Sequence, residues 1–196
     1  MISIVYDIDG VLNDLNKQVC LKLGIDVNIL KFYNVQDNVG VGITQKQADE
    51  IQGLYRDIDF LKTVPLLDDV CGILDIEREF DCKVDLHSLS YTQEFADLKY
   101  RLLKEKLPNL RDDRIFLEVG TNKSTLDNIY ILVEDSIDNI ARSKACVRNV
   151  MIKQPNNNFR NYSYRKEDLN VKVAQDLKHA VQIVRQEVSR VGWRIA

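Results

Sequence analysis

Paired cysteines are missing from this sequence. Its four cysteines are scattered along the chain and no two of them form a CxxC pair: they are Cys20, Cys71, Cys82 and Cys146. Structural zinc sites commonly use such pairs, so we do not expect zinc. Isolated cysteines without a disulfide framework indicate reduced, buried thiols, which is the usual state in the cytoplasm.

Long apolar segments and an excess of positive charge are also missing. No run approaches the length of a membrane span, and the short N-terminal run lacks a basic leader and ends in acids, unlike a signal peptide. The formal net charge of -3 argues against a broad basic face for extended nucleic acid, whereas a small phosphorylated substrate needs only a local positive pocket. We therefore expect a cytoplasmic protein with no membrane or extended nucleic acid as partner. The sequence does not decide whether the protein is a monomer or a homodimer.

The chain has the composition of an ordinary globular protein. Its 196 residues, 45% hydrophobic and 29% charged, suffice for one well-packed domain with an insertion. Apolar stretches alternate with amphipathic ones, which favours an α/β fold with a Rossmann-like, doubly wound parallel sheet. After the N-terminal run, we expect strands at 82–86, 114–119, 129–133 and 150–152. We expect helices at 14–24, 68–80, 92–107, 138–145 and 176–191.

Residues 15–65 read as an inserted, mainly helical cap, because no strongly β-patterned run occurs there. Residues 45–54 predict one of its helices, with Thr44 as the N-cap. The remainder, 1–14 and 66–196, forms the expected α/β core. The aromatic residues of the cap could stack on a base, but packing inside the cap is favoured. These aromatic residues are Phe32, Tyr33, Tyr55 and Phe60.

The rest of the chain is organised around its N-terminal run, residues 2–6, which predicts a buried strand that leads into Asp7, Asp9 and Gly10. Ligand sites in open α/β sheets lie outside the carboxyl ends of the strands. Strand alternation places Asp7 and Asp9 on the same side. Two adjacent carboxylates resist burial, so the pair indicates a divalent metal, or one protonated acid beside one base. Gly10 allows a sharp turn and the close approach of a ligand.

The segment Asp7-Ile8-Asp9-Gly10-Val11 resembles the first motif of the haloacid dehalogenase (HAD) superfamily, whose phosphatases carry D-x-D-G-[VT]. The resemblance implies that Asp7 attacks phosphorus, that Asp9 is the general acid and base, and that Mg²⁺ neutralises the phosphoryl charge. A strand that ends by chance in a D-x-D-G turn is the alternative, so residues further along the chain have to decide between the two.

A candidate second motif follows the strand expected at 82–86. Phosphatases of the superfamily place a Ser or Thr there, which donates a hydrogen bond to the phosphoryl group. Ser88 fits this place best, and Ser90 and His87 remain alternatives. His87 stands where related nucleotidases often have Thr, and we expect a structural or substrate-facing histidine rather than a metal ligand.

A candidate third motif is Lys123, which follows the strand expected at 114–119. A lysine in a loop is uninformative by itself, but the superfamily carries a Lys just upstream of an acidic strand end. A compact ammonium suits both a phosphate oxygen and the carboxylate of the nucleophile. The resemblance therefore makes Lys123, with Ser88 and Gly10, a phosphate-binding residue.

A candidate fourth motif is Glu134-Asp135, which follows the apolar run 129–133. A carboxylate pair at the end of a buried strand is costly unless it is compensated, and oxygen ligands suit Mg²⁺. By the register of the superfamily motif, Asp7, Asp9 and Asp135 are the metal ligands, and Glu134 is an outer helper. Asp138 is a further possible helper, but we expect it to cap the next helix.

Within the superfamily, the chain resembles the 5'(3')-deoxyribonucleotidases, which share the D-x-D-G-V-L start, the helical cap and a hydrophobic-Pro segment, here Val64-Pro65-Leu66. The implied activity is Mg²⁺-dependent hydrolysis of a (deoxy)nucleoside monophosphate through an aspartyl-phosphate. One alternative is a HAD phosphatase for another small phosphate ester or a 3'-phosphate terminus. The other, from a different class, is a non-catalytic binding module with the HAD fold.

Overall fold

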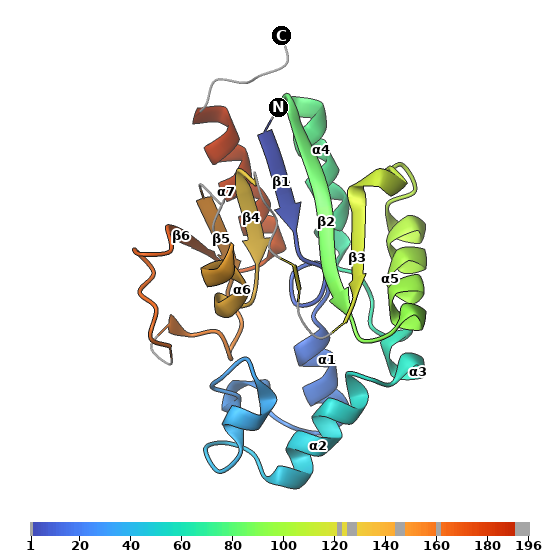
Figure 1. Ribbon diagram of the computed structural model, residues 1–196, viewed down its shortest axis with the longest axis vertical. Coiled ribbons are helices and arrows are strands. Elements are labelled where there is room, and N and C mark those ends of the chain that lie inside the picture. The colour runs from blue at the N-terminus through green and yellow to red at the C-terminus, as the bar shows by residue number, and fades with distance from the viewer. Residues whose placement is uncertain (1, 121–122, 125–128, 144–147, 160–161, 191–196) are drawn as a thin grey trace.

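The protein is described here from a computed structural model (Figure 1). The structure describes residues 2–120, 123–124, 129–143, 148–159 and 162–190. Cys146 and the expected helix ends at Ala145 and Val191 lie outside this range.

One parallel sheet forms the centre of the described chain (Figure 1). Its six strands lie in the order β3-β2-β1-β4-β5-β6. This order is typical of a doubly wound fold, in which the chain reverses direction across the sheet between β1 and β4. The strands are β1 (Ile2–Tyr6), β2 (Cys82–Ser90), β3 (Ile115–Val119), β4 (Ile131–Glu134), β5 (Arg148–Ile152) and β6 (Val171–Ala174).

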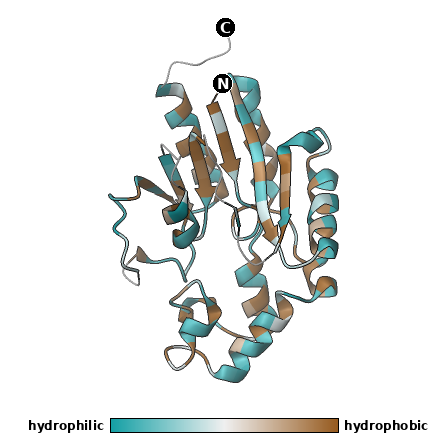
Figure 2. Ribbon diagram, viewed as in Figure 1, coloured by the Kyte–Doolittle hydropathy of each residue, from teal (hydrophilic) through white to brown (hydrophobic). Residues whose placement is uncertain are grey.

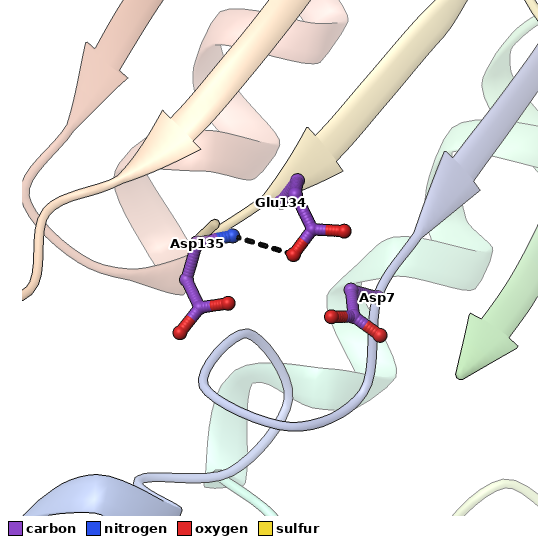
Figure 3. A group of neighbouring side chains, drawn as sticks. All are labelled: Asp7, Glu134 and Asp135. Carbon is purple, nitrogen blue, oxygen red and sulfur yellow. Dashed lines mark hydrogen bonds between the residues drawn. The ribbon is translucent and has the colours of Figure 1, made fainter. Parts of the chain in front are cut away.

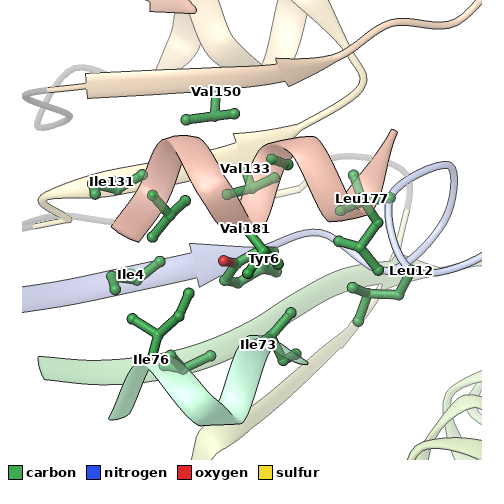
Figure 4. Close-up of a cluster of buried hydrophobic side chains, with 14 of the residues drawn as sticks. Ile4, Tyr6, Leu12, Ile73, Ile76, Ile131, Val133, Val150, Leu177 and Val181 are labelled. Atoms are coloured by element: carbon green, nitrogen blue, oxygen red, sulfur yellow. The ribbon is translucent and has the colours of Figure 1, made fainter. Parts of the chain in front are cut away.

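Helices cover both faces of the sheet. Apolar residues of α4 and α7, such as Ile76 and Val181, pack on Ile4 and Tyr6 of β1 (Figure 4), and α5 joins this cluster through Leu103. The opposite face carries a smaller cluster around α6. Because the central strands bury both faces, they are nearly continuous apolar runs (Figure 2). The helices of the core are α4 (Gly72–Glu79), α5 (Gln93–Lys106), α6 (Ile137–Arg142) and α7 (Leu177–Arg190).

In sequence, the cap is inserted between β1 and β2. It has its own apolar cluster, which includes Val19, Leu30 and Ile51. A β-bridge between Asn13 and Leu66 joins the two chain segments that connect the cap to the core. The expected division at 14 and 66, which falls beside this bridge, stays a prediction. The helices of the cap are α1 (Leu15–Lys22), α2 (Gln45–Leu54) and α3 (Ile58–Leu61), with 3-10 turns at Val27–Ile29 and Val35–Asn38.

The predictions of a parallel α/β sheet, a helical cap and a capping Thr44 are confirmed. The sheet is α/β and parallel, and the cap is helical. Helix α2 begins after Thr44, whose side chain accepts a hydrogen bond from the Gln47 amide while Gln47 bonds back to the Thr44 amide. Among the described residues, no helix is both long enough and apolar enough to cross a membrane.

Other expectations were wrong. Strand β2 continues to Ser90 rather than ending at 86, because the polar side chains of Asp85 and His87 find partners on β3 or just before it. Strand β6 was not expected, since a run of only four residues is too short to show a strand period. The expected helix at 68–80 is present as α4, although its first turn, Asp68–Cys71, is a 3-10 turn. Ser136, rather than Asp138, caps α6.

Candidate active site

A cavity of about 650 Å³ lies between the cap and the carboxyl ends of the strands. Asp7, Gly10 and Ser88 line it from the core, and Tyr33 and Tyr55 line it from the cap. The point where β1 and β4 diverge into opposite halves of the sheet is the usual ligand site of such folds. The cavity therefore lies where the topology predicts chemistry.

Three buried carboxylates meet beside this cavity. Asp7 follows β1, Glu134 ends β4 and Asp135 follows it, and each offers an oxygen within 4.8 Å of the others (Figure 3). Asp7 is 5% exposed, and Glu134 and Asp135 are 1% exposed. Parallel strands bring their carboxyl ends to one edge, which explains how residues more than a hundred positions apart meet.

Lys123 is the cation that pairs with two of these acids. Its Nζ lies 2.9 Å from Asp7 Oδ1 and 3.0 Å from Glu134 Oε2. Glu134 also accepts hydrogen bonds from the amides of Asp135 and Ser136 and from the Asn139 side chain. Glu134 is therefore well satisfied by protein donors.

The electrostatics of the group follow from its burial. Burial, and next the charge of Glu134, raise the pKa values of the Asp7 and Asp135 carboxyls well above their usual range. Burial alone would raise the pKa of Glu134, but Lys123 and the hydrogen bonds outweigh it and lower that pKa. Burial opposes the charge on Lys123, yet Asp7 and Glu134 raise the pKa of this ammonium. The group therefore contains three carboxyl groups and one ammonium, and this single positive charge cannot neutralise all three if they are ionised.

Asp135 is the member whose charge is least compensated. Neither of its carboxylate oxygens has a hydrogen-bond partner, although both are buried. A buried, unpaired carboxylate is costly unless a cation binds it. Three hard oxygen ligands suit Mg²⁺ in particular, so the donor set of Asp7, Glu134 and Asp135 fits a divalent cation.

Asp9 lies outside this acidic group. Its carboxylate is bound by Lys99 Nζ at 2.5 Å, by Asn13 Nδ2 at 3.1 Å and by the Ser88 hydroxyl at 3.4 Å. Lys99 also donates to Ser88 Oγ and to the Leu89 carbonyl, at 3.0 and 2.7 Å. Asp9, Ser88 and Lys99 therefore form one hydrogen-bonded unit on the wall of the cavity.

The structure brings most of the sequence-predicted residues to one place. Asp7, Asp9, Gly10, Ser88, Lys123 and Asp135 all line the cavity. Ser90 lines it as well, whereas His87, one residue from Ser88 along β2, is bonded instead to Glu118 of β3. The acidic group differs in membership from the expected ligands, because it contains Glu134 and not the Asp9 carboxylate. The ligand assignment itself stays a prediction.

Sequence reasoning missed Lys99. This residue stands four positions after Phe95 and four before Leu103, on the buried stripe of α5. A lysine inside an apolar stripe, near the helix end that adjoins the strand tips, is a signal that could have found it.

The loop after β5 bonds both to the candidate site and to the cap. Gln154 Nε2 donates to the Gly10 carbonyl at 2.9 Å, and Asn157 Nδ2 donates to the Asp135 carbonyl at 2.8 Å. The Tyr162 hydroxyl accepts from the Tyr33 amide at 2.9 Å. The described part of this loop therefore holds the backbone of two site residues and one segment of the cap.

No family model and no curated protein sequence matches the chain. Solved structures do match it over nearly its whole length. A HAD family hydrolase from Deinococcus radiodurans with bound phosphate and sodium has a TM-score of 0.55 and 12% identity, over 97% of this chain and 96% of that one. A β-phosphoglucomutase from Clostridium difficile has a TM-score of 0.52 and 14% identity, over 97% and 99%.

A HAD-hydrolase from Bacillus subtilis bound to magnesium is also similar, with a TM-score of 0.51 and 10% identity over 93% and 98% of the two chains. These identities are low and the coverage is high, so the likeness is one of fold. The chain has the HAD-like fold: a six-stranded parallel sheet flanked by helices.

Proposed function

We propose that this protein is a Mg²⁺-dependent phosphomonoester hydrolase that forms an aspartyl-phosphate on Asp7. The observation that carries the proposal is the buried, unpartnered carboxylate of Asp135 beside Asp7, at the strand ends of a HAD-like fold. A cation bound between these carboxylates would offset the cost of burying them, and its charge would in turn attract a phosphoryl group.

Asp7, Glu134 and Asp135 would hold the metal, because they are the acids that the fold gathers. A bound Mg²⁺ supplies positive charge that offsets the phosphoryl oxygens during transfer. Asp9 was also expected as a ligand, but its carboxylate is bonded to Lys99 and Asn13 rather than placed in the acidic group. We keep for it the acid and base role that the resemblance implies.

The reaction has two steps. In the first, a carboxylate oxygen of Asp7 attacks phosphorus, the bond from phosphorus to the ester oxygen breaks, and Asp9 donates a proton to the departing oxygen. In the second, Asp9 takes a proton from water, this water attacks phosphorus, and the bond from phosphorus to Asp7 breaks. Phosphate leaves, Asp7 is again a carboxylate, and Asp9 again carries the proton with which it began the cycle. Splitting the transfer in this way is the logic of covalent catalysis.

Residues around Asp7 stabilise the charge that moves in both steps. Lys123 is already bonded to Asp7 and so stands beside the phosphoryl oxygens. The Ser88 hydroxyl, held by Lys99, is a hydrogen-bond donor on the cavity wall. Preorganised donors of this kind are typically worth about 10²–10³ in rate each.

For the substrate we propose a (deoxy)nucleoside monophosphate. The cavity, at about 650 Å³, has room for a sugar and a base beyond the phosphoryl site. Tyr33, Tyr55 and Tyr91 line it, which supports an aromatic partner for a base, although Tyr55 and Phe60 also pack against the apolar cluster of the cap as expected.

Phosphate release from a panel of esters tests the proposal. The panel contains 5'- and 3'-mononucleotides in deoxy and ribo forms, sugar phosphates and a 3'-phosphorylated oligonucleotide, each with Mg²⁺ and with EDTA. We expect release from mononucleotides that needs Mg²⁺ and that falls by at least about 10³-fold in Asp7→Asn. If phosphate is released only from sugar phosphates or only from the oligonucleotide, the proposed substrate class is wrong. Full activity in Asp7→Asn would overturn the mechanism, and no release from any ester would favour a binding module.

A further inference from the structure

Behind the candidate site, a buried His87 pairs with Glu118, whose side chain is partly exposed. His87 is 1% exposed, and its Nε2 lies 2.7 Å from Glu118 Oε1. Burial, and next the charge of Lys123, lower the pKa of His87. The imidazole is therefore neutral at neutral pH, and a proton on Nε2 makes it a hydrogen-bond donor to Glu118.

Glu118 in turn binds the backbone next to Lys123. Its Oε2 accepts a hydrogen bond from the Ser124 amide at 2.8 Å, and its Oε1 accepts one from the Ser124 hydroxyl. Burial opposes the charge of Glu118, but the Ser124 and His87 bonds outweigh it and lower the pKa of this carboxyl. Glu118 is therefore an ionised anchor on β3 that holds Ser124 by both of its donors.

Lys123 is not held by tight packing alone. A small cavity of about 30 Å³, enough for one water, lies between His87, Lys123 and Glu134. Because Lys123 lines this void, packing does not enclose its side chain on every side. The hydrogen bonds that hold Ser124 therefore help to fix the backbone from which the Lys123 side chain extends. Small displacements of a charged group in a reaction site are costly in rate.

We propose that His87 and Glu118 are positioning residues, which set the place of the Lys123 ammonium between Asp7 and Glu134 by holding Ser124. The inference rests on the proposed function for its catalytic consequence, although the placement itself is a property of the structure. Neither side chain touches the substrate. Both act only through Lys123.

A double-mutant cycle tests this dependence. We expect His87→Leu to lower kcat/KM about 10-fold, with most of the loss in kcat, since the transition state needs the ammonium more than the ground state does. In a Lys123→Met background, His87→Leu should change kcat/KM less than 2-fold. His87→Gln, which keeps an N–H donor, should recover most of the loss. Glu118→Gln, at a more exposed position, repeats the test if His87→Leu does not fold.

Asp85→Asn is the matched control. Asp85 lies two residues before His87 on the same face of β2, is buried and pairs with Lys83 at 3.0 Å and Arg114 at 3.3 Å. It has no bond to the Lys123 segment among the described residues. Its substitution should lower the melting temperature, and any effect on kcat/KM should be equal in the wild-type and Lys123→Met backgrounds. An equal effect of His87→Leu in both backgrounds would overturn the proposal.

A second measurement does not depend on turnover. The rate of Lys123 acetylation by an amine-reactive ester, read by mass spectrometry, reports how firmly the ammonium is held. We expect a rate several-fold faster in His87→Leu and Glu118→Gln than in the wild type and Asp85→Asn. Unchanged acetylation in both variants would refute the positioning role even if the protein is no phosphatase, and faster acetylation without phosphatase activity would refute only the proposed function.

Discussion

Gly10 and Asp135 are in contact across the candidate site: a Cβ added at Gly10 would stand 2.0 Å from Asp135 Oδ2. Gly10 also has a φ of +76°, which side chains rarely adopt. Only a glycine therefore lets the turn after β1 lie against this carboxylate. We expect Gly10→Ala to displace Asp135, to lower kcat/KM by at least about 10²-fold and to weaken Mg²⁺ binding, measured by titration calorimetry.

Gly24→Ala is the control for backbone strain. Gly24 has a φ of +66°, but no atom lies within 4 Å of its added Cβ. The two variants should therefore lose a similar share of stability, about 1 kcal/mol, from the backbone alone. Equal kcat/KM in Gly10→Ala and Gly24→Ala would show that the contact between Gly10 and Asp135 does not matter for activity.

Mg²⁺ should stabilise the protein through Asp135. The raised pKa of this carboxyl means that metal-free stability falls as the pH rises from the usual carboxyl pKa to the raised value, because the folded state binds the proton more tightly. At neutral pH in EDTA, Asp135→Asn should melt at or above the wild-type temperature.

In Mg²⁺ at a hundredfold excess over its dissociation constant, the wild type should gain about 2.7 kcal/mol, or roughly 5–10 °C in melting temperature. Asp135→Asn should gain almost nothing. Asp138→Asn removes the same charge three residues along, outside the acidic group, and should respond as the wild type does. Differential scanning fluorimetry with and without EDTA measures all three, and a full Mg²⁺ shift in Asp135→Asn would contradict the assignment.

Lys99 should matter because it orients Asp9 and Ser88 together. We expect Lys99→Met to lower kcat/KM by about 10–10³-fold, since both hydrogen-bonding groups lose their common donor. Lys104→Met removes a charge from the same helix, where Lys104 binds the Leu110 carbonyl and Asp112, and should leave steady-state kinetics within about 2-fold of the wild type. Similar kinetics for both variants would mean that Lys99 serves the fold alone.

Glu187 should stabilise the core only above acidic pH. Burial alone would raise its pKa, but the bonds from Lys172 at 2.5 Å and Arg148 at 3.0 Å outweigh burial and lower it. A lowered carboxyl pKa contributes stability above the unfolded value, near 4.3, that is lost as the pH falls through the folded value. Glu187→Gln should therefore cost about 1–3 kcal/mol at pH 7 and progressively less below about pH 4, measured by urea unfolding. The exposed pair of Glu79 and Arg185 is the control, and Glu79→Gln should cost under about 1 kcal/mol at either pH.

The local pattern of apolar and charged residues was sufficient to predict the main strands and the acids at their ends. An apolar strand that ends in acids is recognisable because burial and charge conflict there, and this conflict identified Asp7 and the Glu134-Asp135 pair. The Thr44 cap was recognisable for a similar local reason, since its partner Gln47 lies three residues along. The predicted strand at 82–86 ended four residues before β2 does, because the partners that bind the polar side chains of Asp85 and His87 are distant in sequence. These partners are Arg114 and Glu118.

The sequence by itself determined the parallel sheet, the helical cap and which acids stand at the strand ends, because hydrophobic periodicity and the alternation of strands and helices along the chain are visible in neighbouring residues. Only the tertiary structure decided that Glu134 rather than Asp9 joins Asp7 and Asp135, and that Lys99 of α5 reaches Asp9. These contacts depend on how a helix packs back over the sheet and on which way each side chain leaves its strand. Such packing sums many weak contacts between distant segments, and no short stretch of sequence contains them.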